Sequence, residues 1–332
     1  MRTKRVGIAA FVGALALTVA ACGSSDSASE ETATEEVVAT EGGSTYVAII
    51  SKGFQHQFWQ AVQKGAEDTA ASLGVDFTYE GPENESQVDK QMEQLEAALA
   101  KNPSALCFAA LDSKAAIPLL EKAKAAGIPV IAFDSGVDSD IPITTAATDS
   151  VASAALAADK MVELIGGSGK VAIVAHDQTS RTGIDRVAGF KDQIESKYPD
   201  VTIVDIQYGG GDQLKSTDIT KAIIAAHPDI KGIFGANEGS AIGVLNGVKE
   251  SGNIGKITIV GYDSGKAQKD AIKAGEMAGA ITQDPIGIGT KCIEAAVAAT
   301  KGETVAPFID TGFKWYDKTN IDNPDIAAVL YD

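Results

Sequence analysis

Five polar residues follow short apolar runs at places where their side chains could act together on one ligand. They are a hydroxyl, two carboxylates and two amides: Ser51, Asp134, Asn237, Asp263 and Gln283. Each apolar run has the composition of a buried parallel strand, and in open α/β sheets ligands bind at the carboxyl ends of such strands. We therefore expect these side chains to surround one crevice as donors and acceptors of hydrogen bonds.

Each of these residues could instead be the N-cap of the helix that follows it. Asp and Asn are good N-caps, so capping is the simpler explanation for any single position. Capping does not predict Gln283, which precedes Asp284 and Pro285. The fivefold recurrence at one topological position therefore favours a shared site.

The elements that would position these residues alternate as strand and helix from residue 45 onward. The first unit has a strand over 47–50 and apolar Phe58, Val62 and Ala66 at helical spacing, with Phe58 and Trp59 where the helix begins. The same patterns predict strands at 75–80, 105–109, 129–133, 170–174, 201–206, 231–235, 256–261 and 278–282, and helices at 88–99, 115–126, 151–165, 184–197, 216–226, 240–250 and 267–274. Such a chain exceeds the usual size of a single core, which predicts two α/β lobes with a cleft between them.

Catalytic and cofactor motifs are missing from the sequence. The segment Gly166–Lys170 resembles a phosphate-binding loop, but Val171 stands where Ser or Thr is needed and a strand follows instead of a helix. There is no GxGxxG between strand and helix, no GxSxG and no HExxH. We expect no cofactor, no metal and no enzyme activity. A carbohydrate enzyme could use Asp134 and Asp263 as an acid–base pair, but we expect Arg186 to keep both ionised.

The N-terminal residues have the features of a targeting signal. Three basic residues lie before residue 6, residues 6–20 are apolar, and small residues precede Cys22. This pattern is typical of a lipoprotein signal peptide (residues 1–21), which implies cleavage before Cys22 and a lipid on its sulfur. A plain secretory signal with an incidental cysteine is the alternative. Residues 22–44 would then be a disordered acidic linker, and the protein would be extracytoplasmic and anchored to the cell membrane.

Charge and cysteine content restrict the possible partners. The formal net charge is −17, of which residues 1–44 contribute three bases and six acids, so the remainder still carries −14. Such a surface repels nucleic acid, and a sugar-sensing repressor would need a basic helix-turn-helix that residues 1–44 do not offer. The pairing of Cys107 and Cys292 is not readable from sequence, and two buried free thiols are the favoured interpretation.

Several motifs together resemble the periplasmic ribose-binding protein and its relatives, the sugar-binding subunits of ABC importers. They cover most of residues 45–320: HQFW at 56–59, GIPVIAFDSGV with Asp134, TAATD, RxxGF from Arg186, HPDIKGIFGANE with Asn237, TIVGYD with Asp263, AITQDP with Gln283, and DTGFKWYDKTN. The resemblance implies two Rossmann-like, doubly wound lobes with parallel sheets, joined by a three-strand hinge and closing on one ligand. It divides the chain into lobe 1 (45–147 and 284–310) and lobe 2 (148–283 and 311–332).

The resemblance also implies the site and its partners. It assigns ligand contacts to Ser51, His56, Phe58, Trp59, Asp134, Ser135, Arg186, Asn237, Asp263 and Gln283. The implied function is that of a monomer that captures a pentose, hexose or sugar alcohol and delivers it to an ABC permease and its ATPase. A chemosensing receptor, or a binder of a furanose-like signalling molecule, is the alternative.

This sequence departs from the family pattern at three positions. Ribose binders have an arginine where this chain has Ser135, and an asparagine where it has His56. They also have an aromatic residue where this chain has Tyr208 followed by three glycines. The family function is expected to hold, whereas ribose specificity is not.

Overall fold

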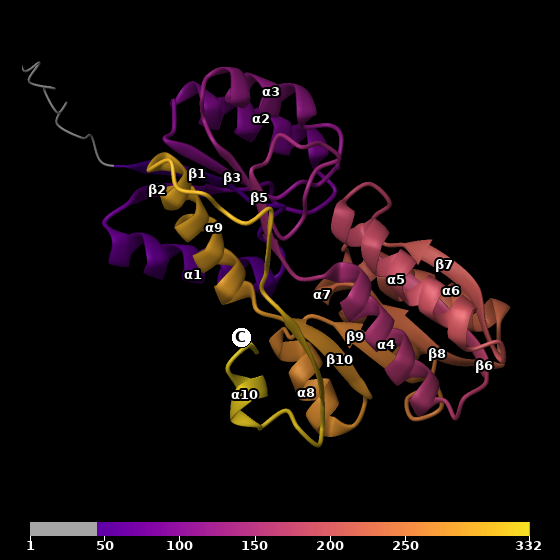
Figure 1. The fold of residues 1–332 in the computed structure, drawn as a ribbon. Helices are drawn as coiled ribbons and strands as arrows, with labels where there is room; N and C mark the ends of the chain where they lie inside the picture. The colour runs from indigo at the N-terminus through magenta and orange to yellow at the C-terminus, as the bar shows by residue number, and fades with distance from the viewer. Residues whose placement is uncertain (1–44, 332) are drawn as a thin grey trace, which may run out of the picture. The chain divides into compact units, whose positions relative to one another are not determined.

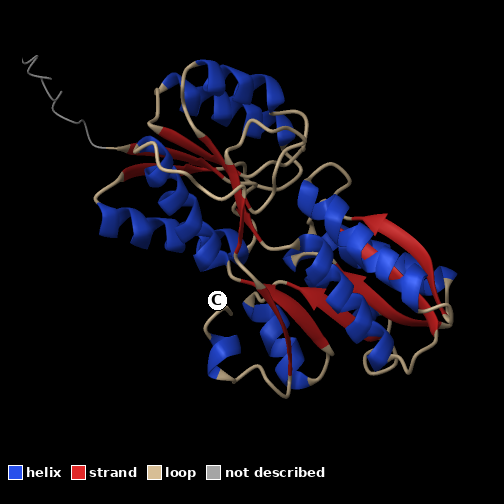
Figure 2. Cartoon of the chain, viewed as in Figure 1, coloured by secondary structure: helices blue, strands red, loops and turns tan. Residues whose placement is uncertain are grey.

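The computed structural model describes residues 45–331, which form two six-stranded sheets (Figures 1 and 2). The predicted signal peptide, Cys22 and the whole predicted linker lie outside the described residues. None of the described helices combines the length and the apolar character needed to cross a lipid bilayer.

The first sheet belongs to lobe 1 and is entirely parallel, in the order β11-β5-β4-β3-β1-β2. Its strands are β1 (Tyr46–Ile50), β2 (Asp76–Glu80), β3 (Ala105–Phe108), β4 (Val130–Phe133), β5 (Thr144–Ala147) and β11 (Phe308–Asp310). Its helices are α1 (Gln57–Leu73), α2 (Val88–Ala100), α3 (Ile117–Ala125) and α9 (Pro285–Thr300). The central strands are uniformly apolar because helices cover both faces, with α1 and α9 on one side and α2 and α3 on the other.

The second sheet belongs to lobe 2 and has the order β12-β10-β9-β8-β6-β7, in which only β12 is antiparallel. Its strands are β6 (Gly169–Ala175), β7 (Val201–Tyr208), β8 (Ile230–Gly235), β9 (Thr258–Tyr262), β10 (Gly279–Gln283) and β12 (Phe313–Asp317). Its helices are α4 (Ser150–Leu164), α5 (Arg181–Lys197), α6 (Gln213–Ala226), α7 (Glu238–Glu250), α8 (Lys266–Ala274) and the short α10 (Pro324–Ala327). Two apolar clusters again cover the two faces.

The chain passes between the lobes three times: from β5 to α4, from β10 to α9, and from β11 to β12. The predicted two-lobed α/β class with a three-strand hinge is therefore confirmed. Because of the second crossing, α9 returns to lobe 1 and lies beside α1 (Figure 1).

Three helices of lobe 2 begin two or three residues before the predicted start. Helices α5, α6 and α7 begin directly after the N-caps Ser180, Asp212 and Asn237, each of which accepts a hydrogen bond from a backbone N–H three residues on. The apolar periodicity starts only in the second turn, so it could not show where these helices begin.

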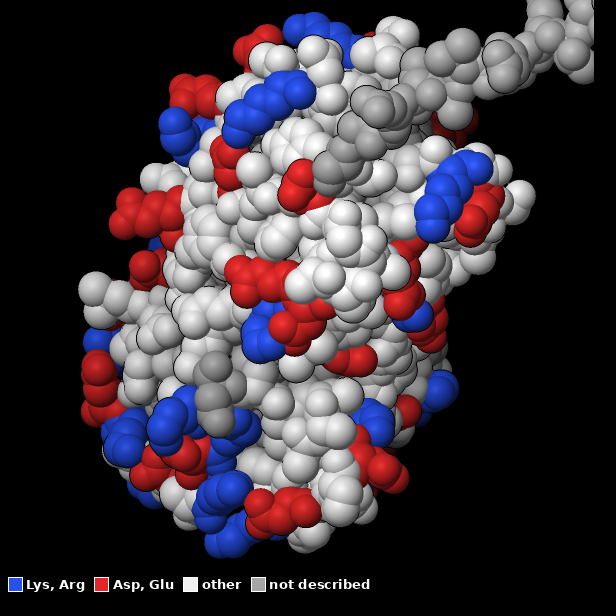
Figure 3. Space-filling view, turned by 90° about the vertical axis from the view of Figure 1, so that its left-hand side faces the viewer, with Lys and Arg blue, Asp and Glu red and all other residues white. Residues whose placement is uncertain are grey.

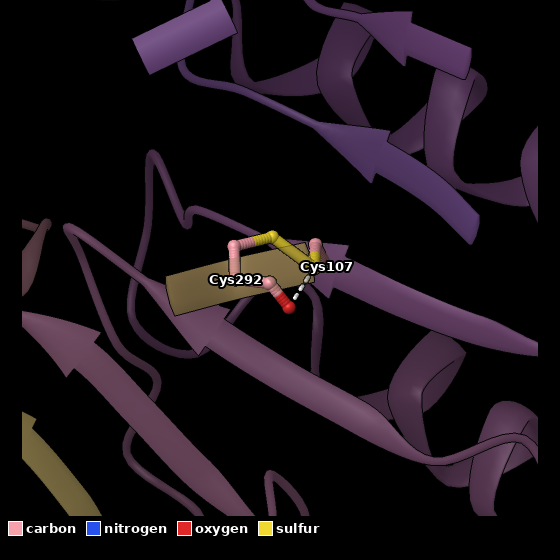
Figure 4. The surroundings of a disulfide bond; sticks show 2 residues. All are labelled: Cys107 and Cys292. Carbon is pink, nitrogen blue, oxygen red and sulfur yellow. Dashed lines mark hydrogen bonds between the residues drawn. A yellow bond between two sulfur atoms is a disulfide. The ribbon is translucent and has the colours of Figure 1, made fainter. Parts of the chain in front are cut away.

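The favoured interpretation of two free thiols is wrong. Cys107 of β3 and Cys292 of α9 form a disulfide across 185 residues of sequence (Figure 4). The bond lies in the core of lobe 1, where α9 packs on the sheet. Sequence could not reveal it, because the crossing that returns α9 to lobe 1 is a feature of the whole fold.

Basic and acidic side chains are interspersed on the face drawn in Figure 3. Many exposed charges of the described residues are paired along or between helices, such as Lys90 with Glu93 and Lys249 with Glu276. This face has no continuous basic surface of the kind that a phosphate backbone would need.

Candidate ligand-binding site

The carboxyl ends of the strands from both sheets enclose a cavity of about 20 Å³. Eight predicted site residues line it: His56, Phe58, Trp59, Asp134, Arg186, Asn237, Asp263 and Gln283. Sequence reasoning missed four further lining residues: Lys52, Glu85, His176 and Thr182. Residues up to 134 come from lobe 1 and the others from lobe 2, so the cavity lies between the lobes.

Two predicted site residues lie outside the cavity. Ser51 is buried, and its hydroxyl donates to the carbonyl oxygens of Gly53 and Glu80, each at 3.3 Å. It therefore joins the end of β1 to the end of β2. Ser135 is fully buried, and its hydroxyl has no hydrogen-bond partner among the described residues. Neither serine side chain is therefore among the residues that line the cavity.

Asp134 and Asp263 occupy equivalent positions in the two lobes. Each directly follows a strand and has left-handed backbone geometry, with φ of 54° and 76°. Each backbone N–H donates to the neighbouring strand, to Ala146 at 3.0 Å and to Ile281 at 2.6 Å. An N-cap has extended backbone, so the capping explanation is wrong for both residues. Left-handed geometry costs an aspartate about 1–3 kcal/mol and is typical of functional sites.

Asn237 and Gln283 fit the capping explanation differently. Asn237 caps α7 through its side-chain oxygen, which accepts from Ser240 N–H at 2.9 Å, while its amide nitrogen faces the cavity. It therefore serves as both a cap and a lining residue. Gln283 is not a cap, because the next residue, Asp284, caps α9.

Lobe 2 holds the carboxylate of Asp263 in place. Gln283 donates to it through Nε2 at 2.8 Å, and the backbone N–H of Glu238 donates at 2.9 Å. Burial raises the pKa of Asp263, although Arg186 and these donors oppose the rise.

The carboxylate of Asp134 is also buried, but no donor among residues 45–331 hydrogen-bonds to it. Burial raises the pKa of Asp134 to about 6, against the nearby charges of Lys52 and Arg186. Arg186 lowers the pKa of both aspartates, as expected, but desolvation outweighs its charge, so both pKa values lie above the ordinary value of an aspartate. Asp134 has acceptor capacity that only a ligand or water can satisfy.

Arg186, from α5, lines the cavity together with these two carboxylates. Its guanidinium carbon stacks 3.8 Å from the ring centroid of Tyr262, and Nη1 donates to the carbonyl of Ala236 at 3.0 Å. Burial disfavours its charge, but the Tyr262, Asp263 and Asp134 groups more than compensate and raise the pKa of Arg186. Its Nε has no partner among the described residues, so one donor is free to meet a ligand.

Glu85, from the loop between β2 and α2, connects the walls of the cavity. It accepts from the indole N–H of Trp59 at 2.8 Å and from the amide of Asn237 at 3.3 Å, across the two lobes. Burial opposes its ionisation, but the charge of Lys52, the nearby imidazoles and the hydrogen bond from Trp59 lower the pKa of Glu85 to about 2. Glu85 does not directly follow a strand, since β2 ends at Glu80, and it fits no periodic pattern. The sequence therefore contained no signal for it.

Lys52 and His176 do follow strands, and the strand-end rule could have found both. The ammonium of Lys52 reaches from lobe 1 to the hydroxyls of Ser180, at 3.4 Å, and Thr182, at 3.1 Å. His176 lies 3.2 Å from the same Thr182 hydroxyl through Nε2, and burial lowers its pKa. These residues supply further donors and acceptors at the boundary between the lobes.

Phe58 and Trp59 form the apolar wall. Their rings meet edge to face with centroids 5.0 Å apart, and Trp59 meets Phe133 in the same way at 6.3 Å. Both side chains are almost completely buried. They begin α1 after an extended loop, which brings them to the end of β1.

The groups around the cavity are suited to binding a small polyhydroxy compound through hydrogen bonds. Three buried atoms without partners belong to residues that line the cavity, namely Arg186 Nε and Nδ1 of His56 and His176, and the Asp134 carboxylate there receives no hydrogen bond from the described residues. Ligand pockets are usually about 300–1,000 Å³, so a ligand larger than water requires the lobes or side chains to move from these positions. Within residues 45–331 no three His, Cys, Asp or Glu side chains are arranged to hold a metal ion.

Known proteins share this architecture. The D-allose-binding periplasmic protein of Escherichia coli K12 is 28% identical over 268 residues, which cover 78% of this chain and 86% of that protein. An ABC transporter solute-binding protein from Agrobacterium vitis, solved with α-D-tagatopyranose, is 31% identical with a TM-score of 0.84, over 86% of this chain and 99% of that one. A second solute-binding protein from the same organism, solved with D-fucose, is 33% identical with a TM-score of 0.83, over 86% of this chain and 100% of that one.

The family assignment rests on the whole chain and not on one motif. Residues 47–304 match the family model described as a periplasmic binding protein domain, which spans parts of both lobes and two of the three crossings. With the fold and the inter-lobe cavity described above, this match shows that the chain belongs to the periplasmic binding protein family.

Proposed function

We propose that this protein captures a monosaccharide or sugar alcohol between its lobes and delivers it to an ABC importer. The observation that carries the proposal is the set of unpartnered buried groups around a cavity with an aromatic wall. Sugar hydroxyls both donate and accept hydrogen bonds, and sugar C–H faces pack against aromatic rings. Relatives named or solved with D-allose, tagatose and D-fucose support the same class of ligand.

The ligand is tested by thermal unfolding with a panel of sugars. D-allose, D-ribose, D-arabinose, D-tagatose and D-fucose, with xylitol and sorbitol, represent pentoses, hexoses and polyols. We expect at least one to raise the melting temperature, because a ligand that binds only the folded state stabilises it by an amount that grows with the logarithm of ligand concentration above Kd. A panel without any shift, repeated by calorimetric titration, would overturn the proposal.

Capture requires the lobes to open and close. The site residues come from both lobes, and three short segments connect them, so a hinge motion is the simplest route for entry. Small-angle scattering should give a smaller radius of gyration with the bound sugar than without it. An unchanged scattering profile at saturating sugar would contradict closure.

We also propose that the protein acts as a monomer outside the cytoplasmic membrane, anchored by a lipid on Cys22 and feeding a permease and its ATPase. The disulfide of lobe 1 supports an oxidising compartment, where such bonds persist. A diacyl anchor provides two chains, enough for stable attachment. Cell fractionation tests the anchor. Cys22→Ala should release the protein from the membrane, and a variant that stayed in the membrane fraction would contradict a lipid anchor on Cys22.

A further inference from the structure

Helix α1 lacks a cap from its own part of the chain. Its N-cap residue, His56, makes no side-chain capping bond, and its first turn contains no acidic residue. By contrast, the N-cap side chain itself caps α4, α5, α6, α7 and α9. The first N–H groups of a helix need partners when they are buried, so α1 must find one elsewhere.

The partner comes from the other lobe. Glu238, the first residue of α7 in lobe 2, accepts from the N–H of Gln57 through Oε1 and from the N–H of Phe58 through Oε2, both at 3.1 Å. Glu238 is 3% exposed, and Tyr331 also donates to it at 3.3 Å. A carboxylate at a helix N-terminus interacts favourably with the helix dipole as well as with the N–H groups.

Lobe 1 also caps a helix of lobe 2. Helix α8 of lobe 2 begins after Gly265, which has no side chain with which to cap it. The backbone N–H of Lys266 donates to the side-chain oxygen of Gln57, from lobe 1, at 2.8 Å. Each lobe therefore caps one helix of the other.

Gly265 leaves room for this contact. A Cβ built there would lie 2.9 Å from the carboxyl carbon and Oε1 of Glu238 and 3.1 Å from the side-chain oxygen of Gln57. Its φ of −55° is accessible to any residue, so the backbone itself does not require glycine. Alanine at this position would displace the two capping groups without straining the chain.

We propose that Glu238 and Gln57 form a latch that holds the lobes together and thereby controls how fast a bound sugar leaves. Neither residue lines the cavity, and these bonds cross between the lobes, so they contribute free energy only when the lobes are together. Opening leaves the first turn of α1 and the N-terminus of α8 to water. The inference rests on the proposed function, because it assigns a release step to that site.

The main test is the release rate of Glu238→Gln, measured by stopped-flow tryptophan fluorescence with D-allose, or with another sugar of the panel if D-allose does not bind. Glutamine keeps the size and one acceptor oxygen but loses the charge. We expect release to be about tenfold faster with the association rate within twofold of wild type, because the latch forms after the sugar enters. The matched control is Glu276→Gln, the same change at a surface ion pair of lobe 2, which should not alter release.

Two further variants separate the latch from a general loss of stability. Gly265→Ala should speed release by displacing the same groups, and the double variant with Glu238→Gln should be no faster than the stronger single variant. Gln57→Ala should have a smaller effect, about threefold. Hydrogen exchange in the sugar-bound protein should become faster at the amides of 57 and 58 in Glu238→Gln, while the interior of α1 is unchanged.

The outcomes distinguish this inference from the function on which it rests. If the wild type binds a sugar and Glu238→Gln and Gly265→Ala both release it within twofold of the wild-type rate, the latch is wrong and the function stands. If wild-type protein binds none of the panel, the function fails and the latch with it. If Glu238→Gln does not fold, Gly265→Ala decides the question alone.

Discussion

The two lobes present equivalent aspartates to the cavity but treat them differently. Asp263 of lobe 2 is fixed by Gln283 and by the backbone of Glu238. Asp134 of lobe 1 has the same left-handed backbone and the same bond to the next strand, yet its carboxylate has no hydrogen-bond donor among the described residues. Lobe 2 therefore presents a carboxylate that is already held in place, whereas lobe 1 presents one whose hydrogen-bond donors must come from a ligand or from water.

The lobes also differ in how their scaffolds are held. Lobe 1 joins β3 to α9 by the Cys107–Cys292 disulfide, while no disulfide occurs in the described part of lobe 2. Lobe 2 is held by its two apolar clusters, and hydrogen bonds join its site residues Asp263 and Gln283 to each other. We therefore expect changes at the site to affect the stability of lobe 2 more than that of lobe 1.

The largest effect is expected at Arg186, whose buried positive charge interacts with the charges of both aspartates. Arg186→Ala should weaken sugar binding more than 100-fold, because breaking a buried charge cluster typically costs about 3–5 kcal/mol. Calorimetric titration measures it, with Lys191→Ala, which breaks an exposed ion pair with Glu195 on the same helix, as the control. Binding within tenfold of wild type would mean that the aspartates do not depend on this guanidinium.

Replacing both Cys107 and Cys292 by serine should lower the free energy of unfolding by about 3 kcal/mol, the usual scale for removing a disulfide that closes a long loop. Because neither cysteine lines the cavity, sugar affinity at temperatures where the variant is folded should change by less than threefold. Chemical denaturation and titration test the two parts. If the free energy of sugar binding fell by as much as the free energy of unfolding, the disulfide would support the binding site and not only the core of lobe 1.

The aspartates themselves give the sharpest contrast. Asp134→Asn and Asp263→Asn should each weaken binding about tenfold, since each removes a charged acceptor from a desolvated site. Only Asp263→Asn should also lower the free energy of unfolding, by about 1–2 kcal/mol, because it disturbs bonds from Gln283 and Glu238. Ser240→Ala, at a buried position outside the cavity, should leave binding unchanged. Equal stability losses for the two asparagine variants would remove the distinction between the lobes.

The smallest effect is on the pH dependence of stability. Asp134 has a folded pKa of about 6, raised from 3.8 by burial, so between these values the folded state binds more protons than the unfolded state. Its contribution to stability therefore falls as pH rises from about 4 to 6, by an amount on the order of 1 kcal/mol or more. Melting temperatures of wild type and Asp134→Asn should converge near pH 4, with the variant more stable at pH 7. If the two curves of melting temperature against pH were parallel, the pKa of Asp134 would be the same in the folded and unfolded states.

The local patterns of the sequence determined the class of the fold and much of the site. The alternation of apolar strands and amphipathic helices predicted two doubly wound lobes, because strand and helix periods depend on residues within a few positions of one another. Asp134, Asn237, Asp263 and Gln283 lie around one cavity because strand ends converge in any parallel sheet, whereas Arg186, on helix α5, was expected there only from the family resemblance. Whether they bind a sugar remains a prediction.

Only the tertiary structure decided which side chains complete that crevice. Glu85 enters from an irregular loop, Lys52 crosses to the other lobe, and Cys107 meets Cys292 because α9 returns to lobe 1. The same is true of the cap that Glu238 gives to α1, since its partners are about 180 residues away in sequence. Sequence periodicity reports which face of an element is buried, but not which distant groups meet there, and this pairing depends on how the three crossings bring the lobes together.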